Sequence, residues 1–343
     1  MTSLSLTIRP ARLRDMPGLM SISSVLTLNQ PETSLAPYQP AHAALTSILP
    51  RRNRSRFFVA DSDEGLLAFA HFQPEPPDQR WQLIALGAST GVYDVTPLWE
   101  ELLERSIVAA GLKGVKRLYA RPPTESPASH ALRAIGFAPY GSEAVLAVEQ
   151  PKLSSSKIQL RRQSPADTWA IHQLYNTVVP RQVQYAEAFT SHRWDSAAKA
   201  SFPSGVTTAA WFVEEAFQVV AYARVRSIGT VHVLDVIVHP DWIGITGDVI
   251  DGALGKVATE RRLGRVYSSI RGYQMETLPT FEERGFQQVA ELELSVKYTT
   301  ARAISPGVEA LPQPEGVLER LPKPKRAPSF YVSPTEDHPQ GLD

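Results

Sequence analysis

Apolar runs and the turn residues between them predict alternating strands and helices over the first 150 residues. Two of the runs flank Asp61-Ser62-Asp63-Glu64-Gly65, a sequence typical of a hairpin loop. From Thr96-Pro97 to about Gly111, apolar residues recur at helical spacing, which predicts a helix packed on a sheet. Its apolar face consists of Leu98, Leu102, Leu103, Ile107 and Ala110. The expected strands cover residues 6–8, 56–60, 66–72, 81–86, 115–120 and 145–148, and further helices begin at Asp15 and Ser129.

The same order of elements returns between residues 157 and 299. In each series the first strands follow one another closely, which favours antiparallel pairing, whereas the later strands alternate with helices. The pattern therefore predicts an α/β fold built on a mixed sheet. The expected strands of the second series cover residues 158–161, 210–214, 219–226, 231–238, 265–270 and 292–297, and helices begin at Asp167, Val249 and Thr280.

Three landmarks indicate that the chain contains one unit twice. Arg9 and Asp15 return as Arg161 and Asp167, a displacement of 152 residues (161 − 9 and 167 − 15). The segment 117–120 returns at 265–268, displaced by 148, and the Gly-Phe pair at 136–137 returns at 285–286, displaced by 149. An offset this long indicates duplicated domains rather than short structural repeats.

The landmarks divide the chain into two domains and a tail. Residues 1–150, which we call the first half, and residues 157–299, the second half, are each expected to fold as one domain. Segment 151–156, rich in Ser and Lys, is the expected linker. Residues 300–343 hold eight prolines and no periodic pattern, so we expect an extended or disordered tail.

Composition restricts the range of functions. Lys plus Arg equals Asp plus Glu at 35 each, so no net charge attracts nucleic acid or a membrane surface. The absence of cysteine excludes disulfides and thiolate catalysis, and His, Asp and Glu do not cluster at metal-ligand spacing, so we expect no metal. No apolar run reaches the roughly 18 residues of a membrane span. We expect a cytoplasmic protein, either a monomer whose domains pack as a pseudo-dimer or a homodimer.

Two segments carry a resemblance to a known family. One is the helix ending in Gly-Phe before the last strand, at 129–137 and again at 280–286. The other is Val236-Ile237-Val238-His239-Pro240-Asp241-Trp242, followed by Gly244. Together with the order of elements, they make each half similar to a GCN5-related N-acetyltransferase domain. The resemblance implies that acetyl-coenzyme A lies between a fourth and a fifth strand that splay apart. Its pyrophosphate would bind a glycine-rich loop and the following helix N-terminus, where backbone N–H groups favour anions.

The glycine-rich loops of both halves depart from the family pattern of Arg or Gln, Gly, any residue, Gly, any residue, Gly or Ala. In the second half Gly244 matches the first glycine, but Ile243 replaces the leading residue and Asp248 adds a negative charge. The first-half stretch 87–97 lacks the spaced glycines and has Pro97 at the helix start, so we predict that this half has lost standard coenzyme binding. The resemblance implies second-half coenzyme contacts from Val236, Val238, Gly244, Thr246, Gly247 and Gln274.

The residue that would protonate the leaving thiolate is missing. The family's tyrosine is matched by Leu132 in the first half and by Phe281 in the second, and neither side chain can give a proton. An active enzyme therefore needs water or another group. Tyr273, just after the fifth strand, either lines the cleft or is an ordinary, partly exposed aromatic residue.

Two catalytic candidates remain for taking a proton from an amine. Asp235 lies in an otherwise apolar strand, where a carboxylate is costly unless it has a function or a partner. Tyr222 lies on the preceding strand. The alternative reading of Asp235 is a structural ion pair with Arg224 or Arg226.

Two hypotheses for function stay open. In the first, the second half transfers the acetyl group of acetyl-coenzyme A, or of a related acyl donor, to an unknown small amine, after Asp235 or a water that it orients removes a proton. In the second, the chain is a noncatalytic scaffold that binds acyl-coenzyme A or protein. The first is the leading hypothesis, and the altered loops and missing tyrosines motivate the second, because a fold does not fix a function.

Overall fold

The computed structural model describes residues 6–48, 56–63, 65–75, 79–90, 92, 94–195 and 205–299. The predicted tail at 300–343 lies outside the described residues. The described residues belong to one compact unit. Among their helices, none combines the length and the apolar composition needed to cross a bilayer.

The elements of the first half follow the predicted order, with two additions. These are a short strand, β2 (Ser24–Thr27), and a helix, α2 (Pro40–Ile48), in a region where the sequence pattern predicts neither. The other elements are β1 (Thr7–Pro10), α1 (Met16–Ser21), β3 (Arg56–Ser62), β4 (Gly65–Glu75), β5 (Arg80–Ala88), α3 (Thr96–Leu112), β6 (Arg117–Ala120), α4 (Pro127–Ala134) and β7 (Ala138–Val148).

The second half repeats this order, and its first strand is much shorter than predicted. Strand β8 covers only Arg161–Arg162. The further elements are α5 (Thr168–Val178), α6 (Arg181–Glu187), the 3₁₀ helix η4 (Ser191–Trp194), β9 (Thr207–Glu215), β10 (Gln218–Ile228), β11 (Val231–Val238), the 3₁₀ helix η5 (Pro240–Ile245), α7 (Thr246–Glu260), β12 (Val266–Arg271), the 3₁₀ helix η6 (Gly272–Thr277), α8 (Leu278–Glu282) and β13 (Gln287–Tyr298).

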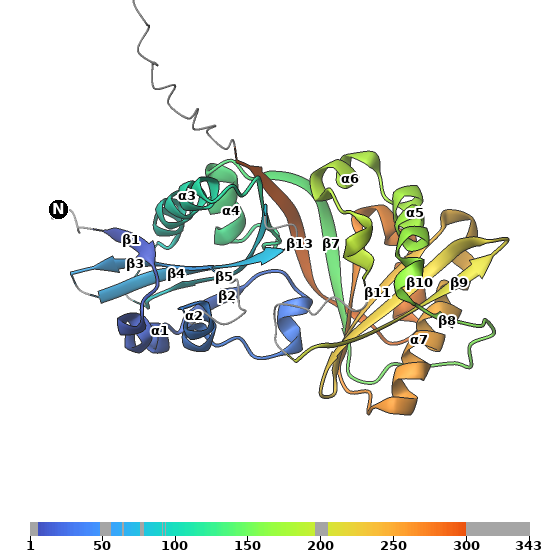
Figure 1. The fold of residues 1–343 in the computed structure, drawn as a ribbon. Coiled ribbons are helices and arrows are strands. Elements are labelled where there is room, and N and C mark those ends of the chain that lie inside the picture. Colours follow the sequence, from blue (N-terminus) through green and yellow to red (C-terminus); the bar gives the residue numbers. More distant parts are fainter. Residues whose placement is uncertain are drawn as a thin grey trace, which may run out of the picture. The chain divides into compact units, whose positions relative to one another are not determined.

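The strands of the described residues form one mixed sheet that runs through both halves (Figure 1). Their order is β1-β3-β4-β5-β6-β13-β7-β12-β11-β10-β9-β8, and β2 pairs with β5 beside this path. Two pairs, β5–β6 and β11–β12, are parallel, and all other neighbours are antiparallel. The predicted mixed α/β architecture is confirmed.

Strands β7 and β13 exchange places between the halves. Residues 143–148 of β7 pair with β12 of the second half, and residues 295–298 of β13 pair with β6 of the first half. The two long strands also pair with each other in the middle of the sheet. Each half thus completes its sheet with a strand of the other. The division of the chain into domains near residue 150 stays a prediction.

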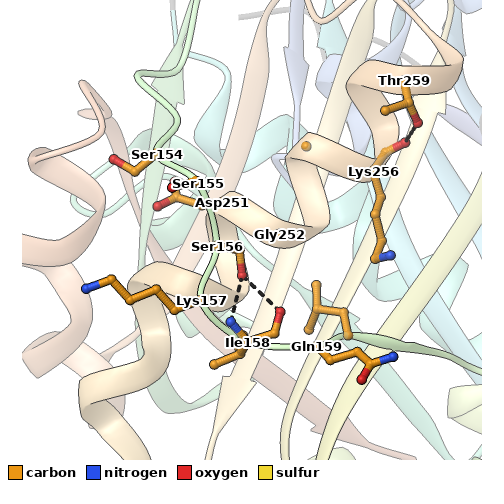
Figure 2. A pocket seen from close by; sticks show the side chains of 12 residues that line it. Ser154, Ser155, Ser156, Lys157, Ile158, Gln159, Asp251, Gly252, Lys256 and Thr259 are labelled. Carbon is orange, nitrogen blue, oxygen red and sulfur yellow. Dashed lines mark hydrogen bonds between the residues drawn. The ribbon is translucent and has the colours of Figure 1, made fainter.

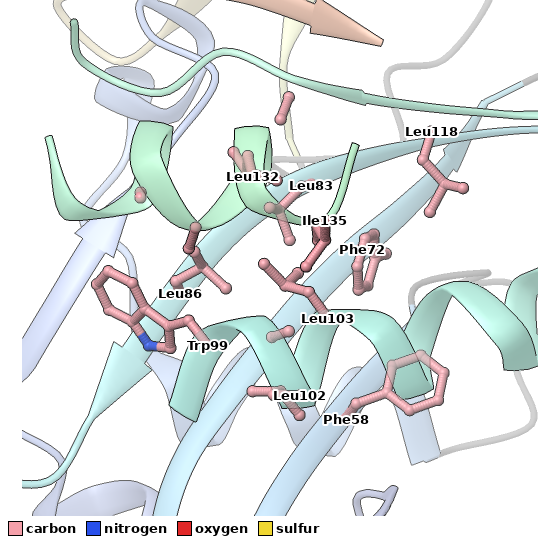
Figure 3. Packing of buried hydrophobic residues seen from close by; sticks show 14 of the residues in the cluster. Phe58, Phe72, Leu83, Leu86, Trp99, Leu102, Leu103, Leu118, Leu132 and Ile135 are labelled. Carbon is pink, nitrogen blue, oxygen red and sulfur yellow. The ribbon is translucent and has the colours of Figure 1, made fainter. Parts of the chain in front are cut away.

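Helices cover both faces of the sheet in the first half. Figure 3 shows the cluster under α3 and α4, in which Trp99 of α3 lies beside Leu86 of β5 and Leu103 of α3 lies beside Phe72 of β4. The neighbouring strand residues, such as Phe57 and Phe69, pack against α1 and α2 on the other face. The predicted apolar face of α3 is confirmed, since Leu102, Leu103 and Ala110 are buried and Leu98 and Ile107 pack partly buried in the same cluster.

The second half is built in the same way. Ala221 and Ala223 of β10 pack in the cluster of α7, whereas Tyr222 between them packs in the cluster of α5. Helices α7 and α5 therefore cover opposite faces of the sheet, because side chains alternate along a strand.

The duplicated sequence landmarks have duplicated structures. Arg9 Nη1 lies 2.7 Å from Asp15 Oδ2, and Arg161 Nη2 lies 2.9 Å from Asp167 Oδ1. Each aspartate also accepts a backbone N–H three residues before it at 2.7 Å, which fixes the start of the first helical turn. The two helix-ending glycines have nearly equal left-handed φ angles of 84° at Gly136 and 86° at Gly285. The glycine is required there, since other residues rarely adopt this conformation.

Candidate functional site

Both halves contain a pair of parallel strands whose pairing stops after three residues. In the first half, β5 and β6 pair at residues 80–82 and 117–119. In the second half, β11 and β12 pair at residues 232–234 and 266–268. Without the additional strand β2, these are the fourth and fifth strands of each half, between which the sequence resemblance places a coenzyme. What lies beyond the paired residues differs between the halves.

In the first half, strand β2 occupies the edge of β5 that β6 leaves. Leu86 of β5 pairs with Ala70 of β4 on one side and with Leu26 of β2 on the other. The whole of β2, residues 24–27, pairs in this way with residues 85–88. The chain itself therefore saturates the backbone of β5 where the fifth strand has separated from it.

The residues after β2 continue across the gap to β6. The Leu28 N–H donates to Ile84 O at 2.7 Å, and the Asn29 N–H donates to Arg121 O at 3.4 Å. The Asn29 side-chain oxygen accepts hydrogen bonds from Gln82 and Arg121. Leu28 is 1% exposed within the core. The gap in the first half is thus filled by a segment tied to both of its walls.

In the second half, no described strand pairs with the equivalent edge of β11 beyond Leu234. A cavity of about 10 Å³, large enough for about one water molecule, lies there. Four of the six residues predicted to contact the coenzyme line it. The lining residues are Val236, Val238, Thr246, Ser269, Ile270, Gln274, Thr277 and Phe281.

The two predicted loop glycines have different surroundings. A Cβ atom at Gly244 would meet no atom within 4 Å, and the φ angle of Gly244 is not left-handed, so the fold itself does not require a glycine there. A Cβ atom at Gly247 would collide with the guanidinium of Arg284. That guanidinium is held by Asp251, with 2.7 Å and 2.9 Å between the bonded atoms. The packing of Arg284 therefore explains why residue 247 is a glycine, whereas Gly244 has space in front of it for a ligand.

Helix α7 begins at the cavity. Thr246, its first residue, lines the cavity, and its hydroxyl donates to Ile243 O at 2.6 Å. The carboxylate of Asp248 is engaged by the first residue after the linker, because Asp248 Oδ1 accepts the Lys157 N–H at 2.8 Å. The N-terminus of a helix of 15 residues carries a partial positive charge, which can hold an anion.

Asp235 is the first residue of β11 beyond its pairing with β12, on the face away from Val236. Its carboxylate lies 3.0 Å from Arg224 Nη2 and 3.1 Å from Arg226 Nη2. Burial alone would raise the pKa of Asp235, but Arg226 and Arg224 outweigh it, so the pKa lies below its ordinary value. The ion pairs posed as the structural alternative are both present, and they make Asp235 a weak base.

Tyr222 does not reach the cavity. Its side chain is fully buried, and its hydroxyl donates to Gln163 Oε1 at 3.2 Å. Burial raises the pKa of Tyr222 to about 12, so the hydroxyl stays protonated at neutral pH. The catalytic roles of Asp235 and Tyr222 stay predictions.

A buried polar cluster at the seam between the halves was not predicted. Glu143 of β7, which is fully buried, pairs with Arg121 at 3.0 Å and with Arg271 at 3.2 Å. Glu187 of α6 lies 3.4 Å from Arg271 and accepts the Tyr175 hydroxyl at 2.8 Å. These residues come from both halves and meet where β7 of the first half pairs with β12 of the second. The signal in the sequence is Glu143 itself, a carboxylate directly before the apolar run Ala144-Val145-Leu146.

A larger, open cavity of about 580 Å³ lies elsewhere, between the linker and α7 (Figure 2). Residues 154–160 form one wall, and Gly252, Gly255 and Lys256 of α7 are among those on the other. It shares no lining residue with the cavity at β11. Within the described residues, no three His, Asp or Glu side chains are grouped to hold a metal ion.

Comparison with known proteins identifies the fold. No protein-family model matches the sequence, and no curated protein matches it. Among solved structures, a GCN5-related N-acetyltransferase from Sphaerobacter thermophilus is similar at 14% identity and a TM-score of 0.54, covering 85% of this chain and 95% of that one. A tandem GNAT protein from the clavulanic acid biosynthesis pathway is similar at 13% identity and a TM-score of 0.54, covering 86% and 98%. The chain therefore has the tandem GCN5-related N-acetyltransferase fold.

Proposed function

We propose that the second half binds acetyl-coenzyme A between β11 and β12 and transfers the acetyl group to a small amine. The observation that carries this proposal is the free edge of β11, next to the N-terminus of α7. Val236, Val238, Thr246 and Gln274, which the resemblance implied as coenzyme contacts, all line the cavity at this edge.

Each part of the site has a role in holding the coenzyme. The free backbone edge of β11 offers hydrogen bonds to the amide groups of the pantetheine arm, as a neighbouring strand would. The N-terminus of α7 holds the pyrophosphate, and Gly244 leaves room for its approach. The pantetheine arm needs more volume than the cavity of about 10 Å³ offers, so binding requires the lining side chains to move apart.

Bound acetyl-coenzyme A supplies a thioester, whose carbonyl carbon accepts the amine nitrogen and whose thiolate leaves. The amine must lose a proton in this step. Arg224 and Arg226 lower the pKa of Asp235, so its carboxylate is a weak base. We therefore propose that Asp235 orients a water molecule and that this water takes the proton of the amine. Phe281 cannot protonate the thiolate, so that proton also comes from water.

The first half has a different role in this proposal. Since β2 saturates the edge of β5 where the coenzyme would lie, we propose that the first half binds no coenzyme. It supplies β7 to the sheet of the second half, and Arg121 and Glu143 to the seam beside the site. One molecule of acetyl-coenzyme A per chain is expected.

The alternative of a noncatalytic scaffold is favoured by one observation, the neutralisation of Asp235 by two arginines. Under this alternative the second half binds the coenzyme without turnover, or binds only protein. Acetylation of any amine that is lost when the coenzyme site is blocked excludes it.

Calorimetry with acetyl-coenzyme A tests the site. The variant Gly244→Val places side-chain atoms in the proposed ligand space, where an added Cβ atom meets no protein atom within 4 Å. Gly255→Val in α7 is the matched control, because a Cβ atom there also meets nothing within 4 Å. We expect binding to be lost in Gly244→Val and kept in Gly255→Val. Equal binding by both variants excludes this loop as the coenzyme site.

A further inference from the structure

One guanidinium at the seam has an N–H group that no described residue accepts. Arg271 ends β12, directly after Ser269 and Ile270, which line the cavity. Its Nε lies 3.2 Å from Glu143 Oε2, and its Nη2 lies 3.4 Å from Glu187 Oε1. Its Nη1 is buried without a hydrogen-bond partner among the described residues. A buried donor without an acceptor is unfavourable, so a ligand that brings an acceptor to this position would be stabilised there.

Two half-buried tyrosines lie close to Arg271 in the fold. Tyr140 of β7 and Tyr273 of η6 pack against the same cluster, that of α5, and Tyr273 follows Arg271 by two residues. Within the part of the chain that the structure describes, neither hydroxyl has a hydrogen-bond partner. Burial raises the pKa of both above the ordinary value, so both carry a proton to donate at neutral pH.

The nearby carboxylates are already engaged by other donors. Glu187 accepts the Tyr175 hydroxyl at 2.8 Å in addition to its ion pair with Arg271. Glu143 accepts two hydrogen bonds from Arg121 Nη1, at 3.0 Å and 3.2 Å. Both carboxylates thus have donors, whereas Arg271 Nη1 has no acceptor among the described residues.

Arg271 lies on the face of the sheet that α5 covers, opposite the face that α7 covers. Val266 and Ile270 of β12 pack in the cluster of α7, so the alternating position Arg271 projects toward the opposite face. Tyr273 and Ile237 pack in the cluster of α5, on that same face. An anion bound by Arg271 is therefore separate from a pyrophosphate at the N-terminus of α7.

We propose that the amine acceptor of the second half carries a carboxylate, as a small amino acid does, and that Arg271, Tyr140 and Tyr273 bind this carboxylate. The inference rests on the proposed acetyl transfer. A carboxylate only accepts hydrogen bonds and offers several lone pairs to the three donors. A carboxamide of the same shape brings donors of its own to this position and is rejected.

The test compares free amino acids with their amides. The full chain is incubated with acetyl-coenzyme A and either the 20 common amino acids or the corresponding amino-acid amides, and the products are measured by mass spectrometry. We expect at least one free acid to be acetylated about tenfold faster or more than its amide, because sites that hydrogen-bond a substrate group discriminate strongly against its replacement.

Variants locate the selectivity. Tyr140→Phe and Tyr273→Phe each remove one hydroxyl that bonds no described residue, so the fold should be unaffected. Each is expected to lower the ratio of acid to amide acetylation by about fivefold or more. Tyr185→Phe is the matched control, since this tyrosine is 71% exposed. Arg271→Gln also breaks two ion pairs, so the tyrosine variants carry the conclusion.

The outcomes separate this inference from the proposed transfer. Equal acetylation of acids and amides, or an unchanged ratio in both tyrosine variants, overturns the carboxylate site and leaves acetyl transfer standing. If neither the amino acids nor their amides are acetylated, ligand-observed NMR measures whether the protein binds each acid and its amide. Binding of the acids but not of the amides, weakened in Tyr273→Phe, supports the site even where transfer fails. Binding of neither series, or equal binding of both, overturns it.

Discussion

Glu143 on β7 and Arg271 on β12 lie directly opposite each other, with 3.2 Å between Glu143 Oε2 and Arg271 Nε. Glu143 precedes the linker in sequence and Arg271 follows it, so this ion pair joins the two halves. Arg121 of the first half binds the same carboxylate. The seam is thus a chain of buried charges that depends on the exchanged strands.

Glu143→Gln is expected to be strongly destabilising. The change leaves two buried guanidinium groups facing a neutral amide, and the loss of one partner from a buried ion pair costs about 3 kcal/mol or more. Urea unfolding measures the change in the free energy of unfolding. Glu149→Gln is the control, because Glu149 pairs with Arg265 in solvent and its loss should have no measurable effect. Equal effects of the two changes contradict a buried seam.

The two copies of the Arg–Asp landmark should differ in strength. Asp15 accepts two N–H groups of Arg9, whose side chain is 11% exposed, whereas Asp167 accepts one from Arg161, which is 56% exposed. We expect Asp15→Asn to cost about 2 kcal/mol and Asp167→Asn about 1 kcal/mol, because solvent weakens the exposed pair. Chemical denaturation of both variants checks the order, and a larger cost at Asp167 is the contrary result.

Stability should fall on mild acidification because of His71. This residue is 1% exposed, its Nδ1 lies 2.9 Å from the Tyr38 hydroxyl, and burial lowers its pKa from 6.5 to about 3. Below pH 6.5 the imidazole of His71 is protonated in the unfolded chain, whereas in the folded chain it stays neutral down to about pH 3. The free energy of unfolding therefore decreases as the pH falls. At pH 5 the loss from this group is about 2 kcal/mol.

The variant His71→Gln isolates this term. Between pH 7 and pH 5, the wild type should lose about 2 kcal/mol more of its free energy of unfolding than His71→Gln loses. His42→Gln, at an exposed position, should show no such shift. A difference that stays constant with pH for His71→Gln contradicts a neutral, buried imidazole.

The apolar pattern predicted most elements of the fold but not their partners. Residues of β7 and β13 were identified as strands, yet periodicity says only that one face is buried and not which strand lies beside it. Strand β2 was missed because four residues carry little periodic signal, and because its partner β5 lies about 60 residues later in the chain. Helix α1 stops at Ser21, before the run Ser24-Val25-Leu26-Thr27, whose β-branched residues favour a strand.

The sequence predicted only part of the candidate site, because local patterns identify residues within one half. Val236, Val238, Thr246 and Gln274 belong to segments of the second half that resemble the family, and the structure places them around one cavity. Glu143, Glu187 and Arg271 come from three segments that meet only at the seam, so no local pattern could group them. The resemblance implied Gly247 as a coenzyme contact, but the space in front of it is taken by Arg284, a contact that only the fold reveals.

Hydrogen exchange should distinguish the two gaps. Because β2 pairs with β5 and the Leu28 N–H bonds Ile84 O, the amides of residues 24–28 should exchange slowly in the coenzyme-free protein and remain unchanged when acetyl-coenzyme A is added. Amides of residues 235–248 should become more protected on addition. Loss of protection in β2 together with gain in β5 contradicts a first-half gap that the chain keeps filled.

The number of acetyl-coenzyme A molecules bound per chain tests the central claim most directly. Native mass spectrometry of the full chain, titrated with acetyl-coenzyme A, counts them. The account predicts one bound molecule, absent from the Gly244→Val variant, because β2 fills the first-half gap and β11 keeps a free edge. Two bound molecules, or one that persists in Gly244→Val, would contradict it.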